Sequence, residues 1–330
     1  MKARTKKNKT RRKQKWGGNP LKGTPMKGSK SSLKRNNAKH NKTFRTLKCS
    51  PKPVSERNHG ESTVKTCYNQ EHLFALKDMW NQRNQNNQIT TIKLDELWLE
   101  LKQKLSNVCD KESCWYKQFS QSKYSEQEIN ELFAPNSPQT WKKDPNEWLS
   151  STDIIKVMRQ YEKIYKCFTF LGPSPVDYDF METQTHCVWD DLCKFQLQKH
   201  IDSGKFKIGI IFNIDKHTGP GIHWVSLFIN MKRKIIFYFD SAGNEIPTNI
   251  KKFVDMVIDQ GKQLSNPILF DFDQNYPKQH QYSTTECGMY SLFFIVRMLE
   301  DKLTTQYLKT HVLTDKYIEK FRKIFYNESE

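Results

Sequence analysis

The sequence predicts an α+β protein in which a central mixed sheet is flanked by helices. Four short segments after residue 200 are rich in β-branched and aromatic residues and are bounded by turn residues, as strands are. They span residues 206–214, 224–229, 234–239 and 268–272. Helical patterns separate or follow them at 248–264, 284–299 and 314–326. Strands that alternate with helices in this way form a sheet with helices packed against it.

The positive charge of the chain is concentrated at its N-terminus. Of the net charge of +18, residues 1–60 contribute +19, from 20 Lys and Arg against the single acid Glu56. This stretch has no apolar period that would offset the entropy of ordering it, so we expect residues 1–60 to be a disordered basic tail. Its charge favours contact with nucleic acid through phosphate neutralisation. A solubilising tail, or a nuclear address at Arg11-Arg12-Lys13, is the alternative.

Two further regions follow the tail. Residues 61–150 form an N-terminal helical region, with apolar residues at helical spacing in Leu94, Leu97 and Leu101. The remainder, residues 151–330, begins with a helix at 152–167 and contains all the predicted strands. It is the expected main domain.

Several classes of protein are excluded by composition. No run of about 18 apolar residues is present, so no membrane span is predicted, and no apolar segment of a secretory signal follows the charged start. The 8 cysteines have neither the density of a disulfide scaffold nor the paired spacing of a zinc site. We therefore expect reduced thiols, a structural role for Cys187 and Cys193, and no metal or organic cofactor.

A predicted hairpin brings a histidine and an aspartate together. If the strands at 224–229 and 234–239 pair symmetrically about the polar connection between them, His223 lies opposite Asp240, with about 5 Å between Cβ atoms. A carboxylate at that distance can orient an imidazole and stabilise its cation. Considered singly, His223 reads as a strand-end histidine and Asp240 as a turn residue.

A cysteine and a glutamine complete the candidate site. Ser283 and Glu286 have capping-box spacing, which places Cys287 in the first turn of an apolar helix, where the helix dipole favours a thiolate. Gln281 precedes it by six residues and can donate to an oxyanion together with the Cys287 backbone N–H. A buried inert cysteine and a surface glutamine are the simpler readings of each residue alone.

These residues resemble a known group of enzymes. Gly221-Ile222-His223-Trp224, Asp240-Ser241, Gln281 and Glu286-Cys287-Gly288 closely resemble the SUMO-protease and adenovirus-protease clan of cysteine peptidases. The resemblance implies a papain-like, SUMO-protease-like core. It also implies that His223 is the general base, Asp240 its orienter, Cys287 the nucleophile and Gln281 the oxyanion donor. Trp224 and Trp148 match two substrate-binding tryptophans that flank a narrow passage for a Gly-Gly tail.

Further motifs are similar to the polyprotein-processing peptidase of African swine fever virus and other large DNA viruses. They are Ser113-Cys114, Leu-Phe-Ala-Pro beginning at Leu132, and Tyr290-Ser291. Asp240 stands where that enzyme has asparagine; either side chain can orient imidazole.

The resemblance implies a cysteine-type endopeptidase, a thiol protease, that cleaves after Gly-Gly in viral structural polyproteins during virion maturation. We expect it in the virion and the host cytoplasm, within viral factories, or in the nucleus if the tail is a targeting signal. One alternative is an isopeptidase that removes SUMO or ubiquitin. Another is a DNA-binding packaging protein with an inactive peptidase scaffold. The tail contains Trp16-Gly17-Gly18-Asn19, which is either a self-cleavage site or a flexible glycine pair.

Overall fold

The computed structural model describes residues 43–52 and 65–329. The helices are α1 (Gln70–Arg83), α2 (Leu94–Leu105), α3 (Glu126–Asn130), α4 (Ser151–Ile164), α5 (Asp190–Cys193), α6 (Leu197–Asp202), α7 (Thr248–Gln263), α8 (Cys287–Leu299), α9 (Thr305–Thr310), α10 (Asp315–Glu319) and α11 (Arg322–Phe325). The strands are β1 (Phe168–Phe170), β2 (Ser174–Pro175), β3 (Lys207–Asn213), β4 (Trp224–Asn230), β5 (Ile235–Phe239) and β6 (Asp271–Gln274). Three 3₁₀ turns lie at Glu112–Cys114, Tyr116–Gln118 and Gln139–Lys142.

The strands form one mixed sheet in the order β1-β3-β4-β5-β6, with β2 also paired to β3. Strand β4 runs antiparallel to both of its neighbours, β3 and β5, whereas β1 and β2 pair in parallel with β3 and β6 pairs in parallel with β5. The predicted mixed sheet flanked by helices is thereby confirmed. Strand β6 begins at Asp271, three residues later than the pattern predicted.

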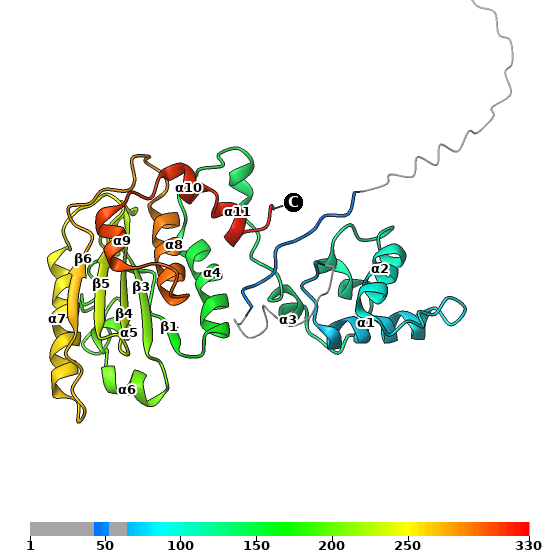
Figure 1. Ribbon diagram of the computed structural model, residues 1–330, viewed down its shortest axis with the longest axis horizontal. Helices are drawn as coiled ribbons and strands as arrows, with labels where there is room; N and C mark the ends of the chain where they lie inside the picture. The colour runs from blue at the N-terminus through cyan, green and yellow to red at the C-terminus, as the bar shows by residue number, and fades with distance from the viewer. Residues whose placement is uncertain (1–42, 53–64, 330) are drawn as a thin grey trace, which may run out of the picture. The chain divides into compact units, whose positions relative to one another are not determined.

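Both faces of the sheet are covered by helices (Figure 1). Side chains alternate along β4, so Phe228 packs with α4 and α8, whereas Leu227 and Ile229 pack with α7. Helix α8 is buried along nearly its whole length, because twelve of its thirteen residues are inaccessible to solvent. A helix that is apolar on all sides and packed centrally provides a rigid support for its first residue, Cys287.

The region before α4 has an apolar core of its own. Aromatic and aliphatic residues of α1, α2 and the following turns pack together around Trp98 and Trp115. The buried carboxylate of Glu112 accepts hydrogen bonds from the Trp98 indole and the Cys67 backbone N–H. The helices before α4 therefore form a folded region with its own apolar cluster. In the sequence this region lies between the basic tail and the domain that contains the sheet.

Residues 43–52 differ from the prediction of a tail over 1–60. The Lys48 backbone N–H donates to the Asn327 side-chain oxygen at 2.7 Å, and the Asn327 side-chain nitrogen donates to the Lys48 carbonyl at 3.0 Å. The backbone of Cys49 also pairs with that of Phe133 in an isolated antiparallel β-bridge. These contacts order the segment because its backbone groups find partners in the body of the protein. The body therefore begins by residue 43, and residues 1–42 and 53–60 of the predicted tail lie outside the described residues.

The cysteines also differ from the expectation of reduced thiols. Disulfides join Cys49 to Cys67, Cys109 to Cys114, and Cys187 to Cys193. Two of these disulfides join cysteines five and six residues apart, and the third spans 18 residues. None of these spacings belongs to a recognised disulfide or zinc motif, so the spacing rules missed them. Cys167 and Cys287 are the free cysteines.

Candidate active site

The β4–β5 hairpin brings His223 and Asp240 together, in a register that differs from the prediction. Ile229 pairs with Ile236 and Leu227 with Tyr238, a shift of two residues from the symmetric pairing. The connection runs one residue further, through Lys234, whose positive φ of 55° completes the turn. A shift of two residues preserves the face on which each side chain lies, and diagonal neighbours remain within reach of a histidine.

His223 and Asp240 are in direct contact, with Nε2 of the ring 2.6 Å from Oδ1 of the carboxylate. The Asp240 carboxylate also accepts hydrogen bonds from the Ala242 backbone N–H and the Asn244 side chain. Burial opposes charge on both groups, but their mutual hydrogen bond outweighs it. As a result the pKa of Asp240 is lowered. Burial would lower the pKa of His223, but hydrogen bonds to Asp240 and Cys287 raise it to about 9.

Asn275 holds the backbone of Asp240 in place. Its side-chain oxygen accepts from the Asp240 N–H at 2.9 Å, and its nitrogen donates to the Asp240 carbonyl at 2.7 Å. Asn275 is fully buried. The sequence analysis missed this residue, since an asparagine in a polar loop carries no distinctive pattern.

Cys287 is the first residue of α8, and its side chain is one of the neighbours that raise the pKa of His223. The predicted first-turn position is therefore found, but the predicted capping box is wrong, because no side chain caps this helix. Ser283 makes no hydrogen bond through its hydroxyl in the described structure. The Glu286 carboxylate pairs instead with Arg322, at 2.9 Å. Burying a carboxylate is costly unless a cation neutralises it, so this ion pair is favoured over a capping hydrogen bond.

Gln281 is held by hydrogen bonds at both ends of its side chain. Its Oε1 accepts from the Ser241 hydroxyl at 2.7 Å, and its Nε2 donates to the Ser283 carbonyl at 2.7 Å. The Gln281 backbone N–H also donates to the Ser241 carbonyl. These bonds fix which end of the amide carries the donors and leave one Nε2 hydrogen for a further acceptor.

The two predicted tryptophans lie on adjoining segments beside the nucleophile. Trp224 donates to the Leu149 carbonyl at 2.9 Å, and Trp148 donates to the Thr284 carbonyl at 2.8 Å. Trp224 is buried, whereas Trp148 is 43% exposed. Gly288 allows this approach, because a Cβ there would lie 2.9 Å from the Leu149 Cβ.

The Cys187–Cys193 pair lies beside Asp190, and ligand atoms of these three residues come within 4.8 Å of one another. His186 also contacts Asp190, at 2.8 Å. A metal ion would require the cysteines as thiolates, whereas here their sulfurs are joined. The expected structural role of the pair agrees with this disulfide.

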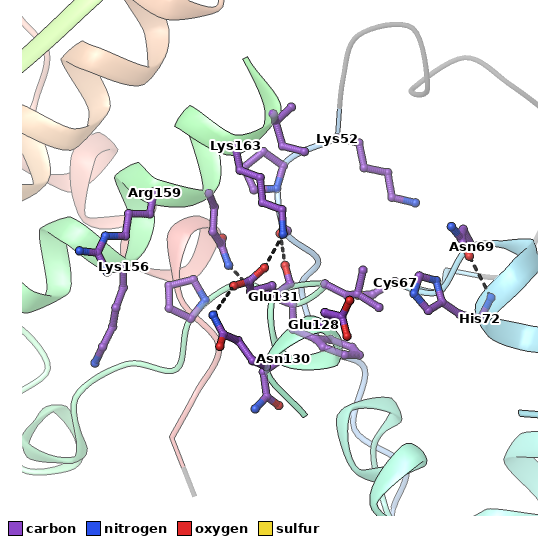
Figure 2. Close-up of a pocket in the computed structure, with 18 of the residues that line it drawn as sticks. Lys52, Cys67, Asn69, His72, Glu128, Asn130, Glu131, Lys156, Arg159 and Lys163 are labelled. Carbon is purple, nitrogen blue, oxygen red and sulfur yellow. Dashed lines mark hydrogen bonds and ion pairs between the residues drawn. The ribbon is translucent and has the colours of Figure 1, made fainter. Parts of the chain in front are cut away.

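A cavity of about 860 Å³ lies away from the catalytic residues, between α4 and the segment around Glu131 (Figure 2). Lys163 of α4 pairs there with Glu131, and the Gln160 side chain donates to the Phe133 carbonyl. The lining contains no nucleophile with a base beside it.

Comparison with known proteins defines the class. Residues 204–330 match the Ulp1 protease family, C-terminal catalytic domain. A relative in Acanthamoeba polyphaga mimivirus, named as a thiol protease, is 29% identical over 272 residues, covering 76% of this chain and 84% of the relative. A cysteine protease of African swine fever virus is 28% identical over 246 residues, covering 69% and 86%.

A crystal structure of an African swine fever virus protease has the same fold, with a TM-score of 0.55 and 17% identity, and the match covers 86% of this chain and 96% of that one. The resemblance predicted from sequence is confirmed. The protein is a cysteine-type endopeptidase with a SUMO-protease-like catalytic domain, similar to proteases of large DNA viruses. Within the part of the chain that the structure describes, no helix is long and apolar enough to cross a membrane.

Proposed function

We propose that the protein cleaves viral structural polyproteins after Gly-Gly during virion maturation. One observation carries this proposal: a histidine paired with a buried aspartate lies near enough to a cysteine at the start of a central helix for that cysteine to raise its pKa. Relatives named as proteases of large DNA viruses support the viral setting.

The reaction is an acyl transfer to sulfur. His223 accepts the proton of Cys287, or the two rest as an imidazolium–thiolate pair, and the thiolate attacks the carbonyl carbon of the glycine before the scissile bond. The oxyanion that forms accepts from the Cys287 backbone N–H and the free Nε2 hydrogen of Gln281. His223 then donates its proton to the leaving amine, and water, deprotonated by His223, hydrolyses the thioester.

The Gly-Gly preference rests on the two tryptophans. Trp148 and Trp224 bracket Leu149 next to the start of α8, so substrate residues just before the cut pass along aromatic walls. Glycine fits a narrow passage that a larger side chain would obstruct.

The test is cleavage of a structural polyprotein precursor and of peptides that contain Gly-Gly-Xaa. We expect cuts after the second glycine, lost in Cys287→Ala, and at least 100-fold slower cleavage when either glycine is replaced by valine. Equal cleavage of the valine peptides would contradict the specificity without contradicting the peptidase chemistry.

The second candidate is removal of SUMO or ubiquitin, favoured by the match of residues 204–330 to the Ulp1 catalytic domain. Fluorogenic conjugates of full-length SUMO and ubiquitin separate the two. Turnover of these conjugates with no cleavage of the precursor would establish the isopeptidase instead. An inactive scaffold is not supported, because the relatives of this chain are named as thiol and cysteine proteases.

The basic tail is proposed to bind DNA and to hold the enzyme on packaged genome, in virions and cytoplasmic viral factories, with the nucleus as the alternative site. Residues 1–42 contain 16 of the 20 tail cations. Deleting 1–42 spares the contacts of residues 43–52. It should abolish salt-sensitive DNA binding while leaving peptide cleavage intact, and undiminished DNA binding would refute this role.

Self-cleavage after Gly18 is a further proposal, on residues outside the described structure. Intact-mass measurement of the purified protein should show loss of residues 1–18 that the Cys287→Ala variant does not show. If both proteins keep intact N-termini, the Gly17-Gly18 pair is not a cleavage site.

A further inference from the structure

A second cavity lies beside Arg322, the residue that pairs with Glu286. Its volume is about 420 Å³, and it is enclosed by the C-terminal residues from Glu319 onward, the segment 137–146 and Lys48. Cavities of this size, roughly 300–1,000 Å³, are typical of sites for small ligands and peptide side chains.

Two buried nitrogen donors among its lining residues have no partner in the described structure. Arg322 is 5% exposed. Its Nε and Nη2 bond to Glu286, and Nη2 also donates to the Asn146 carbonyl. Nη1 bonds to nothing. The second donor is Nε1 of Trp141, which is equally unpartnered.

The two donors belong to one cluster. The Arg322 guanidinium lies over the Trp141 ring, 4.5 Å from its centre, and the edge of Tyr326 packs on the same ring. A buried donor left without an acceptor destabilises the folded protein, and more so when it is charged. Two such donors among the lining residues of one cavity are unusual in a native protein. Neither nitrogen has exposed surface of its own, so an acceptor in the cavity would satisfy both once the side chains around them shift to admit it.

The charges around the cavity favour an anion. Lys48, Lys142 and Lys323 line it, against the acids Glu319 and Glu328. The charge of Glu286 is already matched by Arg322. Arginine N–H groups are best matched by a carboxylate, whose two oxygens accept from two donors at once.

We propose that this cavity binds a side-chain carboxylate of an acidic peptide, with Arg322 Nη1 and Trp141 Nε1 as donors. The volume exceeds the needs of a small inorganic ion and accommodates a peptide side chain with part of its backbone. Because Arg322 also holds Glu286, the bound carboxylate lies one side chain away from the residue that precedes Cys287.

The test is calorimetric titration of the full-length Cys287→Ala protein, so that the result is independent of turnover and of the proposed function. The probes are Ac-Glu-Glu-NH2, the neutral Ac-Gln-Gln-NH2, and sodium sulfate, all at constant ionic strength. We expect one saturable site for the acidic peptide and at least tenfold weaker binding of the neutral one. No saturation, or equal affinity for the neutral peptide, overturns the proposal; tighter binding of sulfate identifies an inorganic-anion site instead.

Matched variants locate the site. Trp141→Phe keeps the ring and removes one donor, so affinity for the acidic peptide should fall about tenfold, the effect of a hydrogen bond to a charged group. Trp189→Phe is its control, since Trp189 Nε1 is likewise unpartnered but does not line this cavity. Lys323→Glu should also weaken binding, with the exposed Lys316→Glu as control. Unchanged affinity in both cavity variants refutes the location.

Discussion

Arg322 holds Glu286 through hydrogen bonds of 3.0 Å from Nε and 2.9 Å from Nη2, and Glu286 is the residue immediately before Cys287. The Glu286 side chain has no exposed surface. Burial raises the pKa of Glu286, and the ion pair with Arg322 counters this only in part. The C-terminal helix α11 thus anchors the start of the helix that carries Cys287.

This ion pair predicts a large loss of stability when one partner is removed. Arg322→Met leaves the Glu286 carboxylate buried without a cation, which costs about 3–5 kcal/mol of unfolding free energy. Urea denaturation measures it. The double variant Arg322→Met with Glu286→Gln should recover most of the lost unfolding free energy. A loss below about 1 kcal/mol in Arg322→Met alone would show that the ion pair contributes little to stability.

The pKa of His223 predicts the alkaline limit of activity. Raised to about 9, His223 stays cationic at neutral pH, and the imidazolium–thiolate pair is lost as the pH rises through that value. The kcat/KM profile should therefore fall with an apparent pKa near 9. In Asp240→Asn the imidazolium loses its anionic partner, so the limb should move to lower pH. If the alkaline fall in kcat/KM keeps the same apparent pKa in Asp240→Asn, a group other than His223 controls it.

Ser241 is predicted to position Gln281. Without its hydroxyl the amide of Gln281 loses the bond that fixes its orientation, so Ser241→Ala should lower kcat about tenfold and leave KM unchanged, since only the oxyanion uses the amide. The control is Ser226→Ala, another buried serine, whose hydroxyl makes no hydrogen bond. If both variants lower kcat equally, the effect of Ser241→Ala comes from altered packing and not from the lost hydrogen bond to Gln281.

Gly288 is predicted to tolerate no side chain. In Gly288→Ala the added Cβ meets the Leu149 Cβ at 2.9 Å, which should cost about 1–3 kcal/mol of stability and displace Trp148 from the Thr284 carbonyl. Urea denaturation and the rise in KM for a Gly-Gly peptide check this together. Wild-type values for both would mean that the segment moves aside freely.

The central sheet and the position of Cys287 at the start of α8 were predictable from hydrophobic periodicity. The contact of His223 with Asp240 was predictable from the hairpin that joins their strands. The hairpin register was missed by two residues, since the left-handed conformation of Lys234 has no sequence signature in a lysine. The partners of Glu286 and of the Asp240 backbone were missed for another reason. Arg322 and Asn275 come from distant positions, and only the tertiary fold brings them there.

The most direct test of the account is labelling with a Gly-Gly vinyl sulfone followed by peptide mapping. Cys167 and Cys287 are the two free thiols, so each serves as the internal reference for the other. We predict modification of Cys287 alone, slowed at least 100-fold in His223→Ala. Modification of Cys167 at a similar rate, or an unchanged rate in His223→Ala, would contradict a nucleophile activated by the His223–Asp240 pair.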